Sequence, residues 1–415
     1  MTQTSPTEQR TILPSGMRVV TERLEHVDSV SLGAWLAVGV CQEQPGQEGL
    51  THLIEHMLFK GTRRRAARQI AEEIDGVGGY LNAFTDREYT CVTARIMSDH
   101  LPLALDVVCD MLAESVFSEN DLGREKQVVI EEIKRYEDSP DELVHDLVQQ
   151  SLWEGHPLGL GLLGNESSVS ATTRESLLNY YRQHYRSPNI TIAAAGNLEH
   201  EQVVEAVTRL LPQEPGDGAD PAPPPSQPTA KTRYVPRPTE QAHFCLAWPA
   251  FSYSDENTYP QAILDAVLGA SPSSRLFQTV REERGLVYNI GSYPIAFTNA
   301  GAFVVTASVS PSNLDEVLDL VGEESKKMAE SVMHEKELQR AKEQILGGLA
   351  LAAESTSFRM RRLAMNEMYL DRSVGFEELR ERVRAITGEQ VRSVAEKVLT
   401  SPSANLVAIG PFHNG

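Results

Sequence analysis

Residues 49–57 read Gly-Leu-Thr-His-Leu-Ile-Glu-His-Met, and this stretch decides how the whole chain is interpreted. It contains the pentad H-x-x-E-H, from His52 to His56, which reverses the commoner H-E-x-x-H zinc signature. Residues four apart in a helix lie on one face, so His52 and His56 are placed to ligate one metal ion. Glu55 lies on the same side, where it can take a proton from a water molecule at that metal. The pentad therefore predicts a zinc site on a helix.

A pentad of this kind also arises by chance, and a lone histidine is more often a satisfied surface or core residue. The neighbouring residues argue for a site, because Leu53, Ile54, Met57 and Leu58 form an apolar stripe along the same helix. A helix with such a buried face would not present ionisable groups beside its core unless something satisfied them.

The composition describes an ordinary globular protein of more than one domain. The chain has 415 residues, of which 41% are hydrophobic and 23% charged, so two domains are expected. The net charge of −20 argues against binding to nucleic acid, whose phosphates need a basic surface. The basic run at 60–65 is expected to be a solvated loop.

The cellular location is predicted from the cysteines and from the absence of a recognisable signal peptide or membrane-spanning segment. The start of the chain has neither the basic nor the apolar region of a signal peptide, and no early apolar run is long enough to span a membrane. The four cysteines show no metal-binding or disulfide spacing and are expected to be buried thiols in a reducing compartment, namely Cys41, Cys91, Cys109 and Cys245. A cytoplasmic location without membrane partners follows.

A linker divides the chain into two halves of similar length. Residues 213–240 are rich in Pro, Gly and small polar residues, the composition of a linker stiffened by polyproline segments. The expected domains are therefore 1–212, which carries the metal helix, and 241–415. Within each half, strands and helices segregate rather than alternate, which predicts an α+β fold in which each domain is a mainly antiparallel sheet packed with helices. The order of elements is alike in the two halves, so we expect two homologous domains.

Two histidines leave a zinc ion short of protein ligands, and the helix expected over 119–137 offers a third. Glu125 and Glu132 are seven residues apart, so they share a face, while Glu131 points about 100° away. Apolar neighbours such as Val128 are expected to bury much of this helix, so a carboxylate on its inner face needs a partner. We choose Glu132 as the ligand and Glu125 as the carboxylate that orients a histidine, but the spacing alone leaves Glu131 as a competitor.

At this point the chain resembles the pitrilysin/insulinase-type zinc peptidases, the inverzincins, and specifically their mitochondrial-processing-peptidase-like branch of short subunits. The resemblance covers nearly the whole chain and rests on these segments: 49–57, 78–85, 125–132, 274–276, 281–282 and 285–288. It implies one Zn²⁺ per chain, bound by His52, His56 and Glu132, with Glu55 as the general base. It also favours Glu132 over Glu131, because the family places its third ligand seven residues after another glutamate.

The resemblance also implies roles for residues outside the metal helix. Arg281 and Tyr288 match the spacing of an Arg/Tyr pair in active members, in which Tyr288 would donate a hydrogen bond to the oxyanion and Arg281 would help to hold the substrate. The alternative is a surface arginine and a packed strand tyrosine.

A short strand of the first half is the expected substrate site. The resemblance implies that an extended peptide pairs with an edge strand there, formed by Asn82, Ala83, Phe84 and Thr85. The alternative is a hairpin strand with a polar residue at its edge. A further histidine, His156, is read as a hydrogen-bond partner within a loop.

The sequence thus predicts a zinc endopeptidase that cleaves unstructured peptides or presequence-like extensions. The alternative is a structural subunit without activity, or one that works only beside a paralogue. Because this chain carries both the metal pentad and the Arg/Tyr pair, we expect a homodimer that encloses the substrate in a closed chamber.

Overall fold

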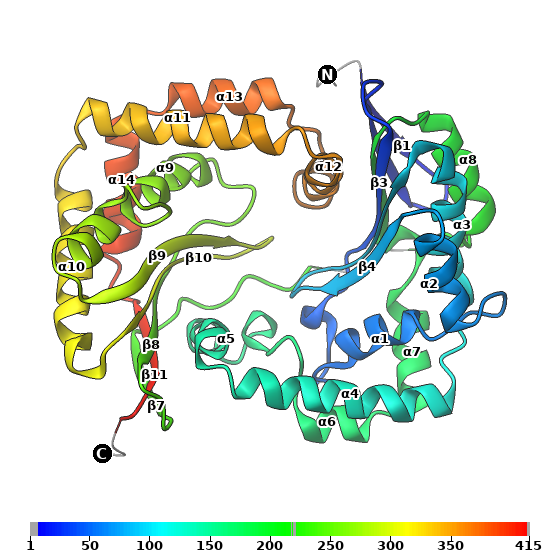
Figure 1. Ribbon diagram of the computed structural model, residues 1–415, viewed down its shortest axis with the longest axis horizontal. Coiled ribbons are helices and arrows are strands. Elements are labelled where there is room, and N and C mark those ends of the chain that lie inside the picture. Colours follow the sequence, from blue (N-terminus) through cyan, green and yellow to red (C-terminus); the bar gives the residue numbers. More distant parts are fainter. Residues whose placement is uncertain (1–6, 217, 219–220, 413–415) are drawn as a thin grey trace. The chain divides into compact units, whose positions relative to one another are not determined.

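The structure of the chain, a computed structural model, describes residues 7–216, 218 and 221–412. It divides into two compact units, and each has one sheet and its own hydrophobic core (Figure 1). The first unit comprises the described residues within Met1–Lys134, Leu160–Pro221 and Leu351–Gly375. The second comprises those within Arg135–Gly159, Ala222–Ala350 and Phe376–Gly415.

The first unit holds a six-stranded sheet and the helices that pack on it. Its main elements are β1 (Glu8–Ile12), β2 (Arg18–Arg23), β3 (Ser29–Leu36), α1 (Leu50–Leu58), α2 (Ala67–Asp75), β4 (Tyr80–Thr85), β5 (Thr90–Met97), α3 (Leu101–Glu114), α4 (Glu119–Glu137), α6 (Glu166–Ala171), α7 (Arg174–His184), β6 (Ile190–Gly196), α8 (His200–Leu210) and α12 (Thr356–Leu370).

The second unit holds a five-stranded sheet. Its main elements are α5 (Pro140–Leu152), β7 (Lys231–Pro236), β8 (Ala242–Pro249), α9 (Thr258–Leu268), a π-helical segment (Phe277–Glu282), β9 (Val287–Ala296), β10 (Gly301–Val309), α10 (Leu314–Glu330), α11 (Glu335–Ala352), α13 (Phe376–Ala385), α14 (Gly388–Leu399) and β11 (Asn405–Gly410).

The two sheets repeat one topology. The strand order is β1-β2-β6-β3-β5-β4 in the first sheet and β7-β11-β8-β10-β9 in the second. The first sheet has one extra strand, β1, at its edge. Apart from β1, each order begins with a parallel pair, β2 with β6 in the first sheet and β7 with β11 in the second, and the three pairs that follow are antiparallel. The predicted α+β fold with two homologous, mainly antiparallel halves is therefore confirmed.

The compact units differ from a simple division of the chain at its linker. Helix α5 precedes the linker but packs on β8 and β11 of the second sheet, whereas α12 follows the linker but packs on β2, β3 and β6 of the first (Figure 1). Because β6 and β11 hold the same place in the two strand orders, as do β3 and β8, the two helices occupy corresponding positions. The halves have exchanged equivalent helices, which the expected ranges 1–212 and 241–415 do not reflect.

Polar contacts fix α12 to the first sheet. Arg362 forms an ion pair of 3.1 Å with Glu22 of β2 and another with Glu8 of β1, and all three residues are buried. The indole nitrogen of Trp35 donates a hydrogen bond of 3.2 Å to the sulfur of Met360. Since an unpaired buried charge is costly, these ion pairs bind α12 in one register.

Two strands depart from the expected layout. Lys231–Pro236 lies inside the segment predicted to be linker but forms β7, the strand at one edge of the second sheet. Its backbone pairs in parallel with β11, and the prolines on either side of it hid this strand in the composition. β1 was not predicted either, because it is short and largely polar.

The basic run at 60–65 is not a solvated loop, contrary to the prediction. Arg65 is buried and its guanidinium lies 2.8 Å from Asp110, while Arg64 pairs with Asp106 at 2.8 Å. Both carboxylates belong to α3, so the loop after α1 is fastened to a neighbouring helix.

Two further expectations concern cysteines and membrane segments. All four cysteines are buried free thiols, as predicted. Among the described residues, no helix is both long enough and apolar enough to cross a bilayer.

Candidate metal centre

Helix α1 is held rigidly at its start, which fixes the histidines that follow. Gly49 has a φ of 84°, and a Cβ there would lie 2.4 Å from the carbonyl oxygen of Leu163, so only glycine fits. The buried carboxylate of Glu43 accepts hydrogen bonds from the backbone N–H groups of Gly49 (2.9 Å) and Thr51 (2.7 Å). Burial raises the pKa of Glu43 to about 7, although these two bonds oppose the shift. The first turn is therefore capped from within the core.

The apolar stripe of α1 is buried as predicted, since Leu53, Ile54, Met57 and Leu58 are each 0% exposed. His52 and His56 leave the helix beside this stripe, with their ring centroids 4.7 Å apart.

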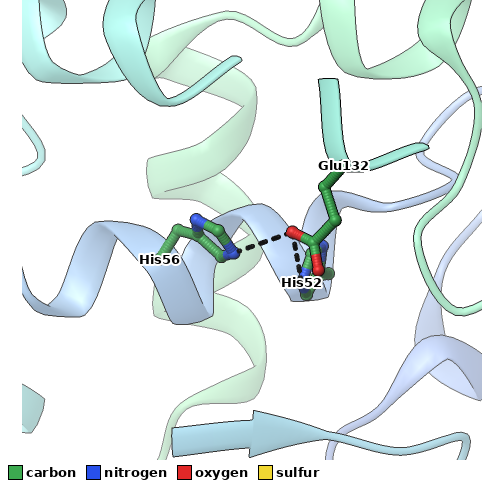
Figure 2. A group of neighbouring side chains, drawn as sticks. All are labelled: His52, His56 and Glu132. Carbon is green, nitrogen blue, oxygen red and sulfur yellow. Dashed lines mark ion pairs between the residues drawn. The ribbon is translucent and has the colours of Figure 1, made fainter. Parts of the chain in front are cut away.

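Glu132 of α4 points toward both histidines (Figure 2). Its Oε2 atom lies 3.8 Å from Nε2 of His52 and 3.5 Å from Nε2 of His56. Ligand atoms of these three side chains all lie within 4.8 Å of one another. The structure thus brings together the residues predicted to bind zinc.

The spacing of these atoms fits a metal ion better than a hydrogen-bonded cluster. Separations of 3.5 and 3.8 Å are long for hydrogen bonds. Ligand atoms about 2.1 Å from a tetrahedral zinc ion lie roughly 3.4 Å from one another. Two imidazole nitrogens and a carboxylate oxygen are also a donor set that zinc commonly takes.

The protonation of His52 is consistent with this fit. Burial lowers the pKa of His52 to about 4, with a further contribution from His56 against an opposing one from Glu132. His52 is therefore a neutral imidazole near pH 7, the form that binds metals. Its Nδ1 atom is buried and has no hydrogen-bond partner among the described residues.

His56 is braced on its other side. Its Nδ1 atom lies 3.2 Å from Oε2 of Glu125, the carboxylate predicted to orient a histidine. Burial by itself lowers the pKa of His56, but the neighbouring carboxylates of Glu132 and Glu125 outweigh it and raise that pKa. With Nδ1 held by Glu125, Nε2 faces Glu132.

The alternative third ligand points elsewhere. The side chain of Glu131 is 73% exposed and pairs with Lys134 at 2.9 Å. Val128 is 49% exposed, so it does not bury the helix as predicted, whereas Val129 and Ile133 do. The inner face of α4 therefore carries Glu125 and Glu132, and Glu131 lies outside the cluster.

Glu55 is positioned by the neighbouring strand β4. The Thr85 hydroxyl donates a hydrogen bond of 2.6 Å to Oε2 of Glu55. Burial raises the pKa of Glu55, and the bond from Thr85 works against that shift. Sequence analysis assigned Thr85 to substrate binding and missed this contact, because spacing along one strand does not show which helix faces it.

The family models match both halves of the chain. Residues 18–166 match the model described as insulinase (peptidase family M16), and residues 171–345 match the model described as the peptidase M16 inactive domain. An uncharacterized zinc protease of Streptomyces coelicolor is 40% identical over 415 residues, which is 98% of this chain and 90% of that protein. The uncharacterized zinc protease YmxG of Bacillus subtilis is 36% identical over 96% of this chain and 97% of that protein.

The chain belongs to the insulinase family, peptidase family M16.

Solved structures agree with the M16 fold. The crystal structure of a peptidase M16 inactive domain from Pseudomonas fluorescens superposes with a TM-score of 0.91 at 21% identity and covers 98% of each chain. That of a protease from Helicobacter pylori gives a TM-score of 0.89 at 19% identity, covering 98% of this chain and all of the other. The candidate metal ligands of this M16 chain lie in its first unit, and most of the half matched as inactive lies in the second.

The predicted substrate strand is β4, which lies at an edge of the first sheet. Asn82 is exposed on it, Ala83 is buried in the core, and the Phe84 ring packs edge-on against Trp35 with centroids 5.6 Å apart. The strand pairs with β5 on one side only, so the backbone of its other side is not engaged by a strand of the sheet.

The predicted Arg/Tyr pair lies in the second unit. The guanidinium carbon of Arg281 is 5.1 Å from the ring centroid of Tyr288 and 4.6 Å from that of Phe277. Tyr288 is 79% exposed. The two predicted residues thus lie together, on a π-helical segment and on β9 respectively.

His156 is a loop residue, as predicted. Its Nε2 atom lies 2.7 Å from the carbonyl oxygen of Pro223, and its Nδ1 accepts a hydrogen bond of 3.2 Å from the N–H of Leu158.

Proposed function

We propose that this chain is a zinc-dependent endopeptidase. The observation that carries the proposal is the convergence of Nε2 of His52, Nε2 of His56 and a carboxylate oxygen of Glu132, with the carboxylate of Glu55 beside them on α1. When bound there, one zinc ion per chain would polarise a peptide carbonyl and lower the pKa of a water molecule toward neutrality. The names of the bacterial relatives support the same reading.

Glu55 would be the general base. Its carboxylate takes a proton from the attacking water and returns it to the leaving amine. Thr85 holds one carboxylate oxygen, which leaves the other free for the water. Because burial raises the pKa of Glu55, its ionised form is a stronger base than an exposed carboxylate.

The substrate would be an extended peptide that pairs with β4. An edge strand offers backbone N–H and C=O groups, which bind any extended chain and leave side-chain specificity loose. Unfolded peptides and presequence-like extensions fit such a site, and folded proteins do not. Asn82 would lie at this edge and Phe84 would contact substrate side chains.

Two chains would share each working site. A single chain has two homologous halves, and two chains facing each other supply four, enough to enclose a peptide in a chamber. In this arrangement Tyr288 of one subunit would donate a hydrogen bond to the oxyanion of the substrate in the site of the other, and Arg281 would hold the substrate. The exposure of Tyr288 supports a role outside the core of its own unit.

Peptide digestion tests the activity. Purified protein is incubated with a mixture of unstructured peptides, with and without a chelator, and the products are mapped by mass spectrometry. Cleavage that stops with chelator and returns with added Zn²⁺ is expected. Cleavage that persists in a metal-free sample would contradict the proposal.

Subunit mixing tests the shared site. Inactive Glu55→Gln subunits are combined with inactive Tyr288→Phe subunits and allowed to exchange. If the site is shared, one site of each mixed dimer is intact and activity returns. If each chain works alone, every site keeps one defect and the mixture stays inactive despite exchange.

A further inference from the structure

Lys60 lies just beyond the end of α1 and contacts the metal centre indirectly. Its Nζ atom is 2.9 Å from Oε1 of Glu125, whose other oxygen, Oε2, is 3.2 Å from Nδ1 of His56. Each oxygen of the Glu125 carboxylate thus has one partner, and the three side chains form a line that ends at a proposed ligand. This inference rests on the proposed function: we propose that Lys60 is a positioning residue of this metal centre, which holds the Glu125 carboxylate in place and directed at His56.

Glu125 is buried, so its position depends on the few groups that contact its carboxylate. The Glu125 side chain is only 9% exposed, and a buried carboxylate that loses its ion-pair partner is costly where it lies and turns toward water. Among the ion pairs of the described residues, Lys60 is the only permanent cation that reaches Glu125.

The contact with the Glu125 carboxylate determines which nitrogen of His56 faces Glu132. A carboxylate accepts hydrogen bonds but donates none, so it selects the tautomer of His56 that carries its proton on Nδ1. The lone pair is then on Nε2, the atom that faces Glu132 at 3.5 Å. A displaced Glu125 would lose this selection and the orientation of the ring with it.

The backbone around Lys60 is fixed, unlike that of an ordinary surface lysine. The N–H of Lys60 bonds to the carbonyl of Met57 at 3.1 Å, and Gly61 turns the chain with a φ of 112°. The hydroxyl of Thr62 donates a hydrogen bond of 2.7 Å to the buried Asp110. The loop is therefore anchored on both sides of the lysine, which directs its side chain toward α4.

Zinc affinity tests the role without any measurement of peptide cleavage. Metal-free protein is titrated with Zn²⁺ in competition with a chromogenic chelator. Lys60→Met should weaken binding about 10- to 100-fold, the usual effect of losing a group that orients a ligand. Lys60→Arg should keep most of the affinity, because it restores the charge.

A matched control comes from the same helix. Lys134 pairs with Glu131 of α4 at the same distance, 2.9 Å, but on the exposed face. Lys134→Met should leave zinc affinity unchanged. If Lys60→Met lowers only the melting temperature of the metal-free protein and zinc affinity stays as in the wild type, the pair is structural and the inference is overturned.

A double-mutant cycle shows whether Lys60 acts through Glu125. In a Glu125→Gln background, Lys60→Met should cause no further loss of zinc affinity, since no carboxylate charge remains to be held. If Lys60→Met alone fails to fold, the double variant can still be measured, because it lacks the Glu125 carboxylate that Lys60→Met would leave buried without a partner. An equal further loss in that background would overturn the inference.

The outcomes also separate this inference from the proposed function. If the wild-type protein binds no zinc, the proposed function fails. If the wild type binds zinc and Lys60→Met binds it equally well, the proposed function stands and the role of Lys60 is wrong.

Discussion

The two units share one strand order, yet their equivalent helices carry different chemistry. α1 precedes the hairpin β4–β5 in the first sheet as α9 precedes β9–β10 in the second. Glu55 of α1 accepts a hydrogen bond of 2.6 Å from Thr85 of β4, and Asp265 of α9 accepts one of 2.5 Å from Ser292 of β9. Both units thus have a carboxylate bound to a hydroxyl of the edge strand.

The histidines distinguish the two helices. His52 lies three residues before Glu55 and His56 one residue after it, and at the same distances from Asp265 α9 carries Ala262 and Ala266. In the described part of the chain, His52, His56 and Glu132 are the one cluster of metal-binding side chains. The comparison teaches that the repeated topology provides a place for a site, and that a few side chains decide whether chemistry occurs there.

The largest expected effect is on kcat, and it distinguishes Glu55 of α1 from Asp265 of α9. Glu55→Gln should lower kcat by about 100- to 10,000-fold, the range for losing a general base, and should leave zinc bound. Asp265→Asn, its counterpart, should leave kcat at pH 7 unchanged. Peptide hydrolysis and metal analysis measure both. Wild-type turnover in Glu55→Gln would remove the general base from the scheme.

The next comparison is between two adjacent glutamates of α4. Glu132→Gln should weaken zinc binding by at least about 100-fold, because a neutral amide is a poor zinc ligand. Glu131→Gln breaks only an exposed ion pair and should leave zinc binding nearly intact. Equilibrium dialysis measures both affinities. The reverse order of effects would show that the ligand assignment is wrong.

Core substitutions test whether each unit stabilises its own helix. Leu53 and Leu264 are both 0% exposed, so replacing either with Ala should lower the free energy of unfolding by about 2–5 kcal/mol. Leu53→Ala should also weaken zinc binding, since it loosens α1, whereas Leu264→Ala should not. Urea unfolding and a zinc titration measure the two effects. Equal loss of zinc affinity in both variants would contradict this separation.

The smallest expected effect is a pH dependence in the second unit. Burial raises the pKa of Asp265 from 3.8 to about 6, against the bond from Ser292. A group with a raised folded pKa adds stability below its unfolded pKa and loses it as pH rises through the folded one. Between pH 4 and 6, wild type should therefore lose up to about 3 kcal/mol relative to Asp265→Asn. Urea unfolding of both at several pH values measures this difference, and a constant difference would refute the shift.

Much of the metal centre could be predicted from the sequence because it depends on helical periodicity. His52 and His56 are four apart in one helix, and the buried stripe of α1 follows the same period. Glu131 and Glu132 were not separable by spacing, since either can lie on an inner face. The structure distinguishes them by burial and by the exposed partner Lys134.

The contacts between elements could not be predicted. Lys60 and Thr85 meet Glu125 and Glu55 only because α4 and β4 lie beside α1. Lys60 in particular belongs to a basic run that has the composition of a solvated loop. The fold class followed from the order of strands and helices, but β7 lay hidden among prolines.

The exchange of α5 and α12 was also invisible in the sequence. The buried residues of α5 are mostly apolar, whereas those of α12 include Arg362, Asn366 and Glu367. The sequence of such a helix shows at most that one of its faces packs on something. It does not show which of two similar sheets receives it.

This exchange constrains how the protein can be made. The hydroxyl of Ser31 in β3 bonds to that of Thr356 in α12, a partner 325 residues later in the chain. During synthesis, the sheet that bears the metal helix therefore waits for its covering helix until most of the chain has left the ribosome. Contacts so distant in sequence slow folding, because a long loop must close before they form. A fragment that ends at the linker would retain every proposed metal ligand and still expose the sheet face that α12 covers.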